Sequence, residues 1–413
     1  MIRYLLVHFG WFVFVVTGSA FSQEAVSPVG AMSVAEGGAN RITRMVEAQS
    51  VTPYVGVTTD GSAIEGLYSI DPDRGASNAD LVREAKDFLA ALTQEQRGKA
   101  MFPVAAPEWR QWSNTSSYQR NGISFDEMTE GQREQAFNLM RTAFSAKGFK
   151  LSRDIMRLNH TLGELTSDPG RYSEWFYWLT FMGEPSETEP WGWQIDGHHL
   201  VVNYFVLGNQ VVMSPLFTGS EPVIAESGHY KGMSVMEPER DRANAVYASL
   251  TDEQRKTAEL MSEDLVADGG GRAFGRGSIE LMEDNAVIPY RGIRVEDLSA
   301  VQRDLVIELI EEFLFFDREV HARDRMEEVM AHMDETYFGW DQWDASLGPD
   351  DLFFFRIQSP VIIIEFDHQG AIALPNARSD IPIREHIHTV VRIPNGNDYG
   401  KDLLRQHYEQ HPH

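Results

Sequence analysis

Two stretches decide the fold class: residues 191–206 read WGWQIDGHHLVVNYFV, and residues 353–368 read FFFRIQSPVIIIEFDH. Both consist mainly of β-branched and aromatic residues, which are typical of strands. Each is interrupted by residues that favour a turn, Asp196-Gly197 in the first and Ser359-Pro360 in the second. The two stretches therefore predict two hairpins of antiparallel strands.

Working outward from the hairpins, one short pattern occurs twice before each of them. It consists of an apolar residue, Thr or Ser, two variable residues and Gln-Arg, and it occupies residues 92–97, 128–133, 250–255 and 298–303. Thr or Ser followed three residues later by Gln is a capping box, and the apolar residue before it acts as a staple, so each copy predicts the start of a helix. The order of these segments predicts an α+β protein with two pseudo-repeated halves, each a pair of capped helices followed by antiparallel hairpin strands.

The start of the chain resembles an export signal. Arg3 is followed by an apolar run that ends in small residues, and we expect residues 1–22 to be removed on export. The alternative is a membrane anchor, but the run is shorter than the roughly 20 residues that a spanning helix needs. We therefore expect a periplasmic or secreted protein with no stable membrane span after signal cleavage. We expect a flexible lead-in over 23–50, a first α+β half over 51–235, and a second half over 236–413 that ends in a strand and a helix.

Composition excludes several classes of function. The 413 residues include 36 Lys and Arg against 62 Asp and Glu, which gives a net charge of −26 and argues against nucleic acid as a partner. The hydrophobic fraction of 42% is enough for a packed core. The chain has no cysteine, which excludes disulfides, thiol catalysis and iron–sulfur clusters. Any metal ion must therefore be held by histidine or by oxygen ligands, and the expected partner is a small molecule.

Four histidines form the main candidate site. His386 and His388 are two residues apart in a strand-like stretch, so both side chains point to the same face. His198 and His199 are adjacent and point to opposite faces, so only one of them can readily join the same site. Without thiolates, imidazole and carboxylate ligands suit a divalent transition metal: zinc, iron, manganese or copper. The alternative is that these histidines are buried and hydrogen-bonded to carboxylates such as Asp367.

Three further residues are candidates for catalytic roles. Glu365 and His368, at the end of the second hairpin, could serve as a further ligand or as the general base. Arg392 follows His388 by four residues on the same face, and its guanidinium suits an anionic group of a substrate. The alternative for Arg392 is an internal salt bridge to Asp398 or Asp402.

Several long motifs resemble one family. They include Trp191-Gly192-Trp193 and the segments at 197–200, 214–217, 365–368, 386–392 and 394–400. In this order they are similar to the bacterial proteins grouped as domain of unknown function 3500, an exported family, and the likeness runs from about residue 85 to residue 408. The resemblance implies no particular activity, so the function has to be inferred from the residues.

Two classes of function remain open. The first is an exported metal-dependent enzyme, in which a metal-bound water attacks a small anionic or sugar-like substrate as in a hydrolase, or the same ligands support a non-haem metal oxygenase. The second is an exported protein that binds a small molecule between the two halves without catalysis. The metal-dependent enzyme is favoured if the ring nitrogens converge on one point from His199, His386 and His388. Separations beyond about 8 Å between these nitrogens favour the binding protein.

Overall fold

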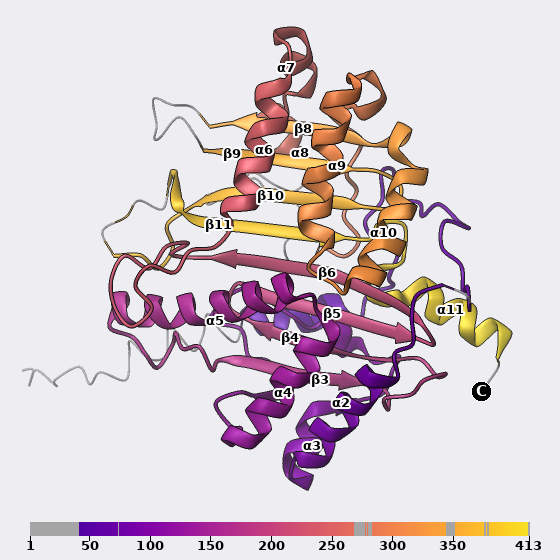
Figure 1. Ribbon diagram of the computed structural model, residues 1–413, viewed down its shortest axis with the longest axis vertical. Helices are drawn as coiled ribbons and strands as arrows, with labels where there is room; N and C mark the ends of the chain where they lie inside the picture. Colours follow the sequence, from indigo (N-terminus) through magenta and orange to yellow (C-terminus); the bar gives the residue numbers. More distant parts are fainter. Residues whose placement is uncertain are drawn as a thin grey trace, which may run out of the picture.

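The computed structural model describes residues 41–72, 74–267, 283–343, 352–375 and 380–411, together with residues 277, 279 and 377. These residues form a mixed α/β protein in which helices lie on a large, mostly antiparallel sheet (Figure 1). The predicted signal over 1–22 and the lead-in up to residue 40 lie outside the described residues. The end of the predicted lead-in, residues 41–50, is helical. In the part of the chain that is described, no helix combines the length and the apolar character needed to span a bilayer.

The sheet has the strand order β1-β3-β4-β5-β6-β11-β10-β9-β8-β7, with β2 paired to β3. In chain order the strands are β1 (Met101–Phe102), β2 (Ile123–Ser124), β3 (Tyr177–Met182), β4 (Trp191–Gly197), β5 (Leu200–Leu207), β6 (Gln210–Ser220), β7 (Ile293–Arg294), β8 (Tyr337–Gln342), β9 (Phe353–Gln358), β10 (Ile363–Gly370) and β11 (Pro382–Arg392). Strands β3 to β6 form one antiparallel meander and β8 to β11 form another. The two meanders join where β6 pairs with β11, with Thr218 opposite Thr389.

The α-helices that precede and follow these strands are α2 (Ala79–Ala91), α3 (Gln94–Ala100), α4 (Glu130–Ala143), α5 (Ala146–Thr166), α6 (Glu237–Ser249), α7 (Asp252–Ala258), α8 (Ser262–Ala267), α9 (Ala300–Leu314), α10 (Glu319–Ala331) and α11 (Lys401–Gln410). All four predicted capping boxes are confirmed, at the starts of α3, α4, α7 and α9. The glutamines of these boxes are also hydrogen-bonded in two pairs, one between α3 and α4 and one between α7 and α9. Gln132 Nε2 donates to Gln96 Oε1, and Gln302 Nε2 donates to Gln254 Oε1, both over 2.8 Å.

The turn of the first hairpin lies two residues later than predicted. Strand β4 continues through Asp196 and Gly197, Gly197 pairs with Leu200, and the turn consists of His198 and His199. Gly197 is needed for packing, because a Cβ atom there would lie 2.1 Å from the Tyr177 ring. The second hairpin turns between β9 and β10 as predicted, around Ser359-Pro360.

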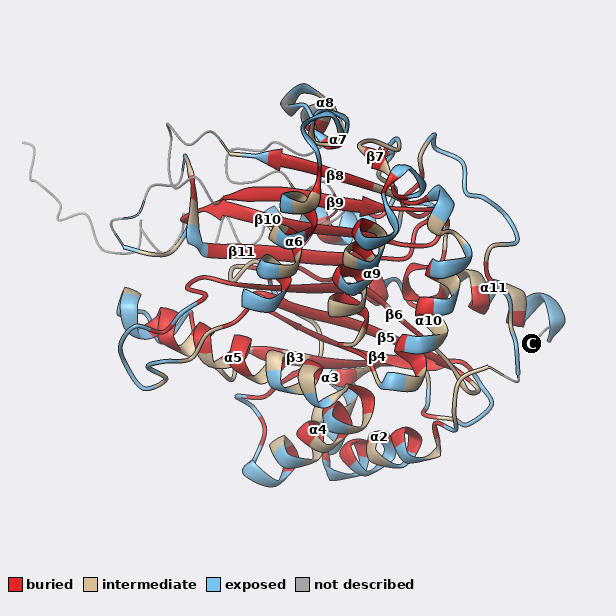
Figure 2. Cartoon of the chain, turned by 45° about the horizontal axis from the view of Figure 1, so that its top comes forward, coloured by how far each residue is buried: buried red, intermediate tan, exposed pale blue. Residues whose placement is uncertain are grey.

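The two faces of the sheet differ. Helices α5, α6, α9 and α10 lie over one face, and the strands are almost wholly buried (Figures 1 and 2). That face is aromatic, as the contact of Phe313 on α9 with Phe355 on β9 shows. The opposite face carries polar side chains in register, including Gln194 hydrogen-bonded to Asn203. Irregular segments near residues 107–112, 283–288 and 393–400 cover this polar face.

Candidate functional site

Three histidines meet on the polar face of the sheet. The Nε2 atom of His386 lies 3.0 Å from Nε2 of His388 and 3.3 Å from Nε2 of His199. All three side chains are buried, and one possible ligand atom from each lies within 4.8 Å of the others. The structure thus brings together three of the four predicted metal ligands, and this group could hold a metal ion.

The two meanders both contribute to this group. His386 and His388 extend from the same face of β11, as their spacing predicted. His199 reaches them from the turn between β4 and β5, where its φ of +64° is uncommon for a residue with a side chain. The His199 carbonyl accepts a hydrogen bond of 2.9 Å from Gly219 N, which holds the turn against β6.

Gly219 makes room for the imidazoles. It lies opposite His388 in the pairing of β6 with β11. A Cβ atom at Gly219 would lie 2.6 Å from the carbonyl oxygen of Ile387, 3.1 Å from His388 Cδ2 and 3.4 Å from His199 Cδ2. The site therefore needs a residue without a side chain here. The glycine in a strand was a signal that sequence analysis could have used, but it did not.

Hydrogen bonds fix the orientation of the His386 ring. Its Nδ1 lies 2.7 Å from the carbonyl oxygen of Gly370, and since a carbonyl can only accept, Nδ1 carries the proton. Nε2 then presents its lone pair to the other two rings. Metal-ligating histidines usually have this arrangement, in which the outer nitrogen donates to a carbonyl or carboxylate.

Glu221 supports the same ring from the side. One of its carboxylate oxygens lies 4.0 Å from His386 Nδ1. The other accepts hydrogen bonds of 2.9–3.0 Å from the backbone N–H groups of residues 372, 373 and 374, which follow β10. Glu221 therefore anchors this loop beside the histidines. Sequence analysis missed it, because a single acidic residue before a proline carries no recognisable signal.

Burial keeps at least two of the imidazoles neutral. Removal from water lowers the pKa of His388 to about 3, with the carboxylate of Glu221 acting in the opposite direction. Burial, together with the neighbouring histidines, also lowers the pKa of His199 well below its ordinary value. Neutral imidazole is the form that coordinates a metal ion.

His198 does not join this group. Its ring stacks on that of His199 with 3.9 Å between centroids, and its Nδ1 lies 2.8 Å from Oδ1 of Asn159 on α5. His198 is only half-buried and lines a pocket of about 350 Å³. Of the two adjacent histidines only His199 joins the group. The expectation that they point to opposite faces of a strand was wrong, because both lie in the turn and their rings stack.

The structure places Glu365 and His368 away from the three histidines. Glu365 lies in a buried ion pair of 2.8 Å with Arg356 on the neighbouring strand. His368 occupies the helix-covered face, where its Nδ1 lies 3.0 Å from the carbonyl oxygen of Phe353. His368 lies on the other face because successive side chains of a strand point to opposite faces. In the pairing of β10 with β11, His368 is opposite Ile387, whereas Asp367 is opposite His388.

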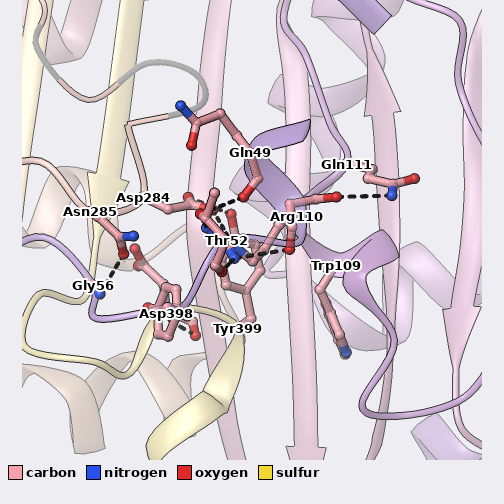
Figure 3. A network of polar contacts seen from close by, with 12 residues as sticks. Gln49, Thr52, Gly56, Trp109, Arg110, Gln111, Asp284, Asn285, Asp398 and Tyr399 are labelled. Atoms are coloured by element: carbon pink, nitrogen blue, oxygen red, sulfur yellow. Dashed lines mark hydrogen bonds and ion pairs between the residues drawn. The ribbon is translucent and has the colours of Figure 1, made fainter. Parts of the chain in front are cut away.

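Arg392 is also placed elsewhere, in a buried ionic network. It is 0% exposed, and its Nη1 lies 2.8 Å from Asp284 and 3.1 Å from Asp398. Figure 3 shows this region, where Asp284 also pairs with Arg110 and accepts a hydrogen bond from Tyr399. The alternative of an internal salt bridge to Asp398 therefore describes Arg392 better than contact with a substrate does.

Comparison with known families gives one match. A family described as "Protein of unknown function (DUF3500)" matches residues 74–401, most of the chain. A search of curated proteins and a search of solved structures found no match. The chain therefore belongs to the DUF3500 family.

Proposed function

We propose that the protein holds a divalent transition-metal ion at His199, His386 and His388 and uses it for hydrolysis. The observation that carries the proposal is the convergence of three Nε2 atoms, with separations of 3.0 and 3.3 Å from His386. Nitrogen ligands about 2.0–2.1 Å from one ion lie roughly 3.3 Å apart in a tetrahedral arrangement and about 2.9 Å apart at right angles. The observed separations match that range.

Hydrogen bonding among the rings accounts less well for the arrangement. Nε2 of His386 presents a lone pair, because the proton is on Nδ1. Another imidazole can donate one proton to that lone pair, so one such hydrogen bond joins only two of the three rings. An ion at the centre would accept all three lone pairs at once.

The set of ligands favours hydrolysis among the possible metal reactions. Catalytic zinc sites have three protein ligands and keep a position for water or substrate, whereas structural sites are closed by four. A bound divalent ion would lower the pKa of its water to near 7 and so supply a nucleophile. Three imidazoles also differ from the two histidines and one carboxylate of non-haem iron oxygenases. Asp367, opposite His388, is the candidate to accept a proton from that water.

The proposal includes export and a small substrate. The apolar run and small residues over 1–22 support export to the periplasm or the outside. The net charge of −26 supports a small molecule rather than nucleic acid as the partner. We propose an anionic or sugar-like substrate, and zinc, iron, manganese or copper as the ion.

We also propose that residues 51–235 and 236–413 are related by an internal duplication. Three observations support it: the mirrored strand order about the β6–β11 pair, the two pairs of capping boxes, and the matching glutamine contacts. In both pairs the glutamine of the later box also donates to the last residue of an earlier helix. Gln132 donates to the carbonyl of Ala91 on α2, and Gln302 donates to the carbonyl of Ser249 on α6. The metal site would then lie where the two halves join.

Hydrolytic activity can be tested on the purified protein with chromogenic carboxylic and phosphoric esters. We expect a measurable rate that is lost when a chelator removes the metal and that returns when the ion is added back. His386→Ala should lack the rate under all conditions. A rate that chelation does not change, or that His386→Ala retains, would contradict metal-dependent hydrolysis.

A further inference from the structure

A pocket next to the histidine group has the properties of a ligand site. Its volume is about 350 Å³, within the range of roughly 300–1,000 Å³ that is usual for small-molecule sites. Its lining includes Ser116, Asn159, Arg171, Phe176, Trp178 and His198. The lining thus combines a cation, aromatic rings and neutral polar groups.

Arg171 provides a positive charge at this pocket. Its Nε donates a hydrogen bond of 3.0 Å to Ser116 Oγ, and its guanidinium lies 5.3 Å from the centre of the Tyr172 ring. Among the described residues, no carboxylate lies within ion-pairing distance of Arg171, although the chain carries 62 acidic residues. An exposed guanidinium with unused donors beside a pocket suits a carboxylate or phosphate group.

Phe176 and Trp178 provide an apolar aromatic surface. Phe176 immediately precedes β3 and Trp178 is the second residue of that strand; both line the pocket, and their ring centroids lie 6.4 Å apart. Both are half-buried, whereas Tyr177 between them is buried against the core. The guanidinium of Arg120 lies 5.3 Å from the Trp178 ring. Such rings stack on aromatic or sugar rings.

His198 provides a hydrogen-bond acceptor of defined orientation. Asn159 Nδ2 donates to the carbonyl of Ser173 over 2.8 Å, so Asn159 Oδ1 faces His198 and accepts from its Nδ1. The His198 proton is therefore on Nδ1, and Nε2 keeps its lone pair. Among the described residues, Nε2 of His198 has no hydrogen-bond partner, so it can accept a hydrogen bond from a donor group of a ligand, whereas the anionic group of that ligand would lie at Arg171.

The same ring connects the pocket to the proposed metal site. His198 stacks on His199 with 3.9 Å between centroids, so a ligand against His198 lies one imidazole away from a metal ligand. We propose that this pocket binds a small anionic molecule with a flat ring, an aromatic carboxylate or aryl phosphate. Binding in this pocket does not depend on the proposed metal reaction.

Calorimetric titration of the metal-loaded full chain would test the proposal. The probes are benzoate and phenyl phosphate, with neutral benzyl alcohol and inorganic phosphate as comparisons. We expect one of the two ring-bearing anions to bind at least about tenfold more tightly than either comparison probe, because only they engage both Arg171 and the aromatic rings. If neither anion binds, or if benzyl alcohol binds as tightly, the proposal is wrong.

Matched variants separate the pocket from the metal site. Arg171→Gln and Trp178→Leu should each weaken binding at least about tenfold, whereas Arg83→Gln, which removes an exposed arginine on α2, should not. Unchanged melting temperatures would show that the variants fold. His386→Ala, which changes the histidine group but no residue of the pocket lining, should retain binding. Equal binding by Arg171→Gln and Arg83→Gln would contradict binding of the anion in this pocket. Failure of metal-dependent hydrolysis alone would contradict only the proposed function.

Discussion

At the scale of single residues, the site depends on the lack of a side chain at Gly219 as well as on three imidazoles. Gly219→Ala should lower metal affinity at least about tenfold without removing a ligand, because the new Cβ atom would press on the strand and on the rings of His388 and His199. The measurement is a competition titration with a chromogenic chelator. Gly131→Ala on α4 is the matched control, since a Cβ atom there meets nothing within 4 Å. Equal metal affinity in the two variants would contradict the packing described for Gly219.

The buried histidines also predict a pH dependence of stability. In the folded, metal-free protein the pKa of His388 is about 3, whereas in the unfolded chain it has its ordinary value of 6.5. Between these values only the unfolded chain binds the proton, so the free energy of unfolding should fall as pH falls from about 6.5 toward 3, by up to about 1.4 kcal/mol per pH unit for this residue. Above about 6.5 both states are neutral and the contribution is constant.

Urea unfolding of the metal-free protein at several pH values would measure this dependence. His388→Gln removes the titrating group but keeps a polar side chain of similar length, so its stability should fall less steeply between pH 6 and pH 4. Parallel pH profiles of the two proteins would show that His388 is protonated as easily in the folded state as in the unfolded chain.

At the scale of elements, the paired capping boxes should contribute similarly in both halves. Gln132 and Gln302 each accept a hydrogen bond from the N-cap residue of their own helix. Each also donates to the glutamine of the earlier box and to the last residue of α2 or α6. Gln132→Ala and Gln302→Ala should each lower the free energy of unfolding by roughly 2 kcal/mol, because several partly buried hydrogen bonds are lost. Chemical denaturation measures this loss. Gln94→Ala, on the exposed start of α3, is the control, and a large loss in only one half would contradict the equivalence.

Helix starts were predictable from sequence because a capping box is a local interaction. All four predicted boxes open helices, with the N-cap hydroxyl accepting from the third backbone N–H in each. The turn of the first hairpin was not predictable in the same way. Asp196-Gly197 has the composition of a turn, but Gly197 is small because the Tyr177 ring packs on it, and this contact is tertiary. The turn therefore lies at His198-His199, which brings His199 to the site.

At the scale of the whole molecule, the α+β class and the strand-rich hairpins followed from residue patterns, but the continuous sheet did not. The pairing of β6 with β11 joins residues more than a hundred positions apart, and nothing local specifies it. That pairing nevertheless determines the site, because it sets Gly219 opposite His388. Spacing correctly indicated that His386 and His388 share a face. Spacing could not show that Arg392, on the same face, is neutralised by Asp284, which lies far away in the sequence.

The central claim is that His199, His386 and His388 hold one metal ion, and metal content tests it most directly. The full chain, purified without an affinity tag, would be analysed by mass spectrometry of the elements beside the double variant His386→Ala/His388→Ala. His332→Ala is the control, because His332 is a histidine paired with Glu335 away from the site. We predict about one equivalent of a transition metal in the unmodified protein and in His332→Ala, and almost none in the double variant. Less than about a tenth of an equivalent in the unmodified protein, or the same content in the double variant, would contradict the claim.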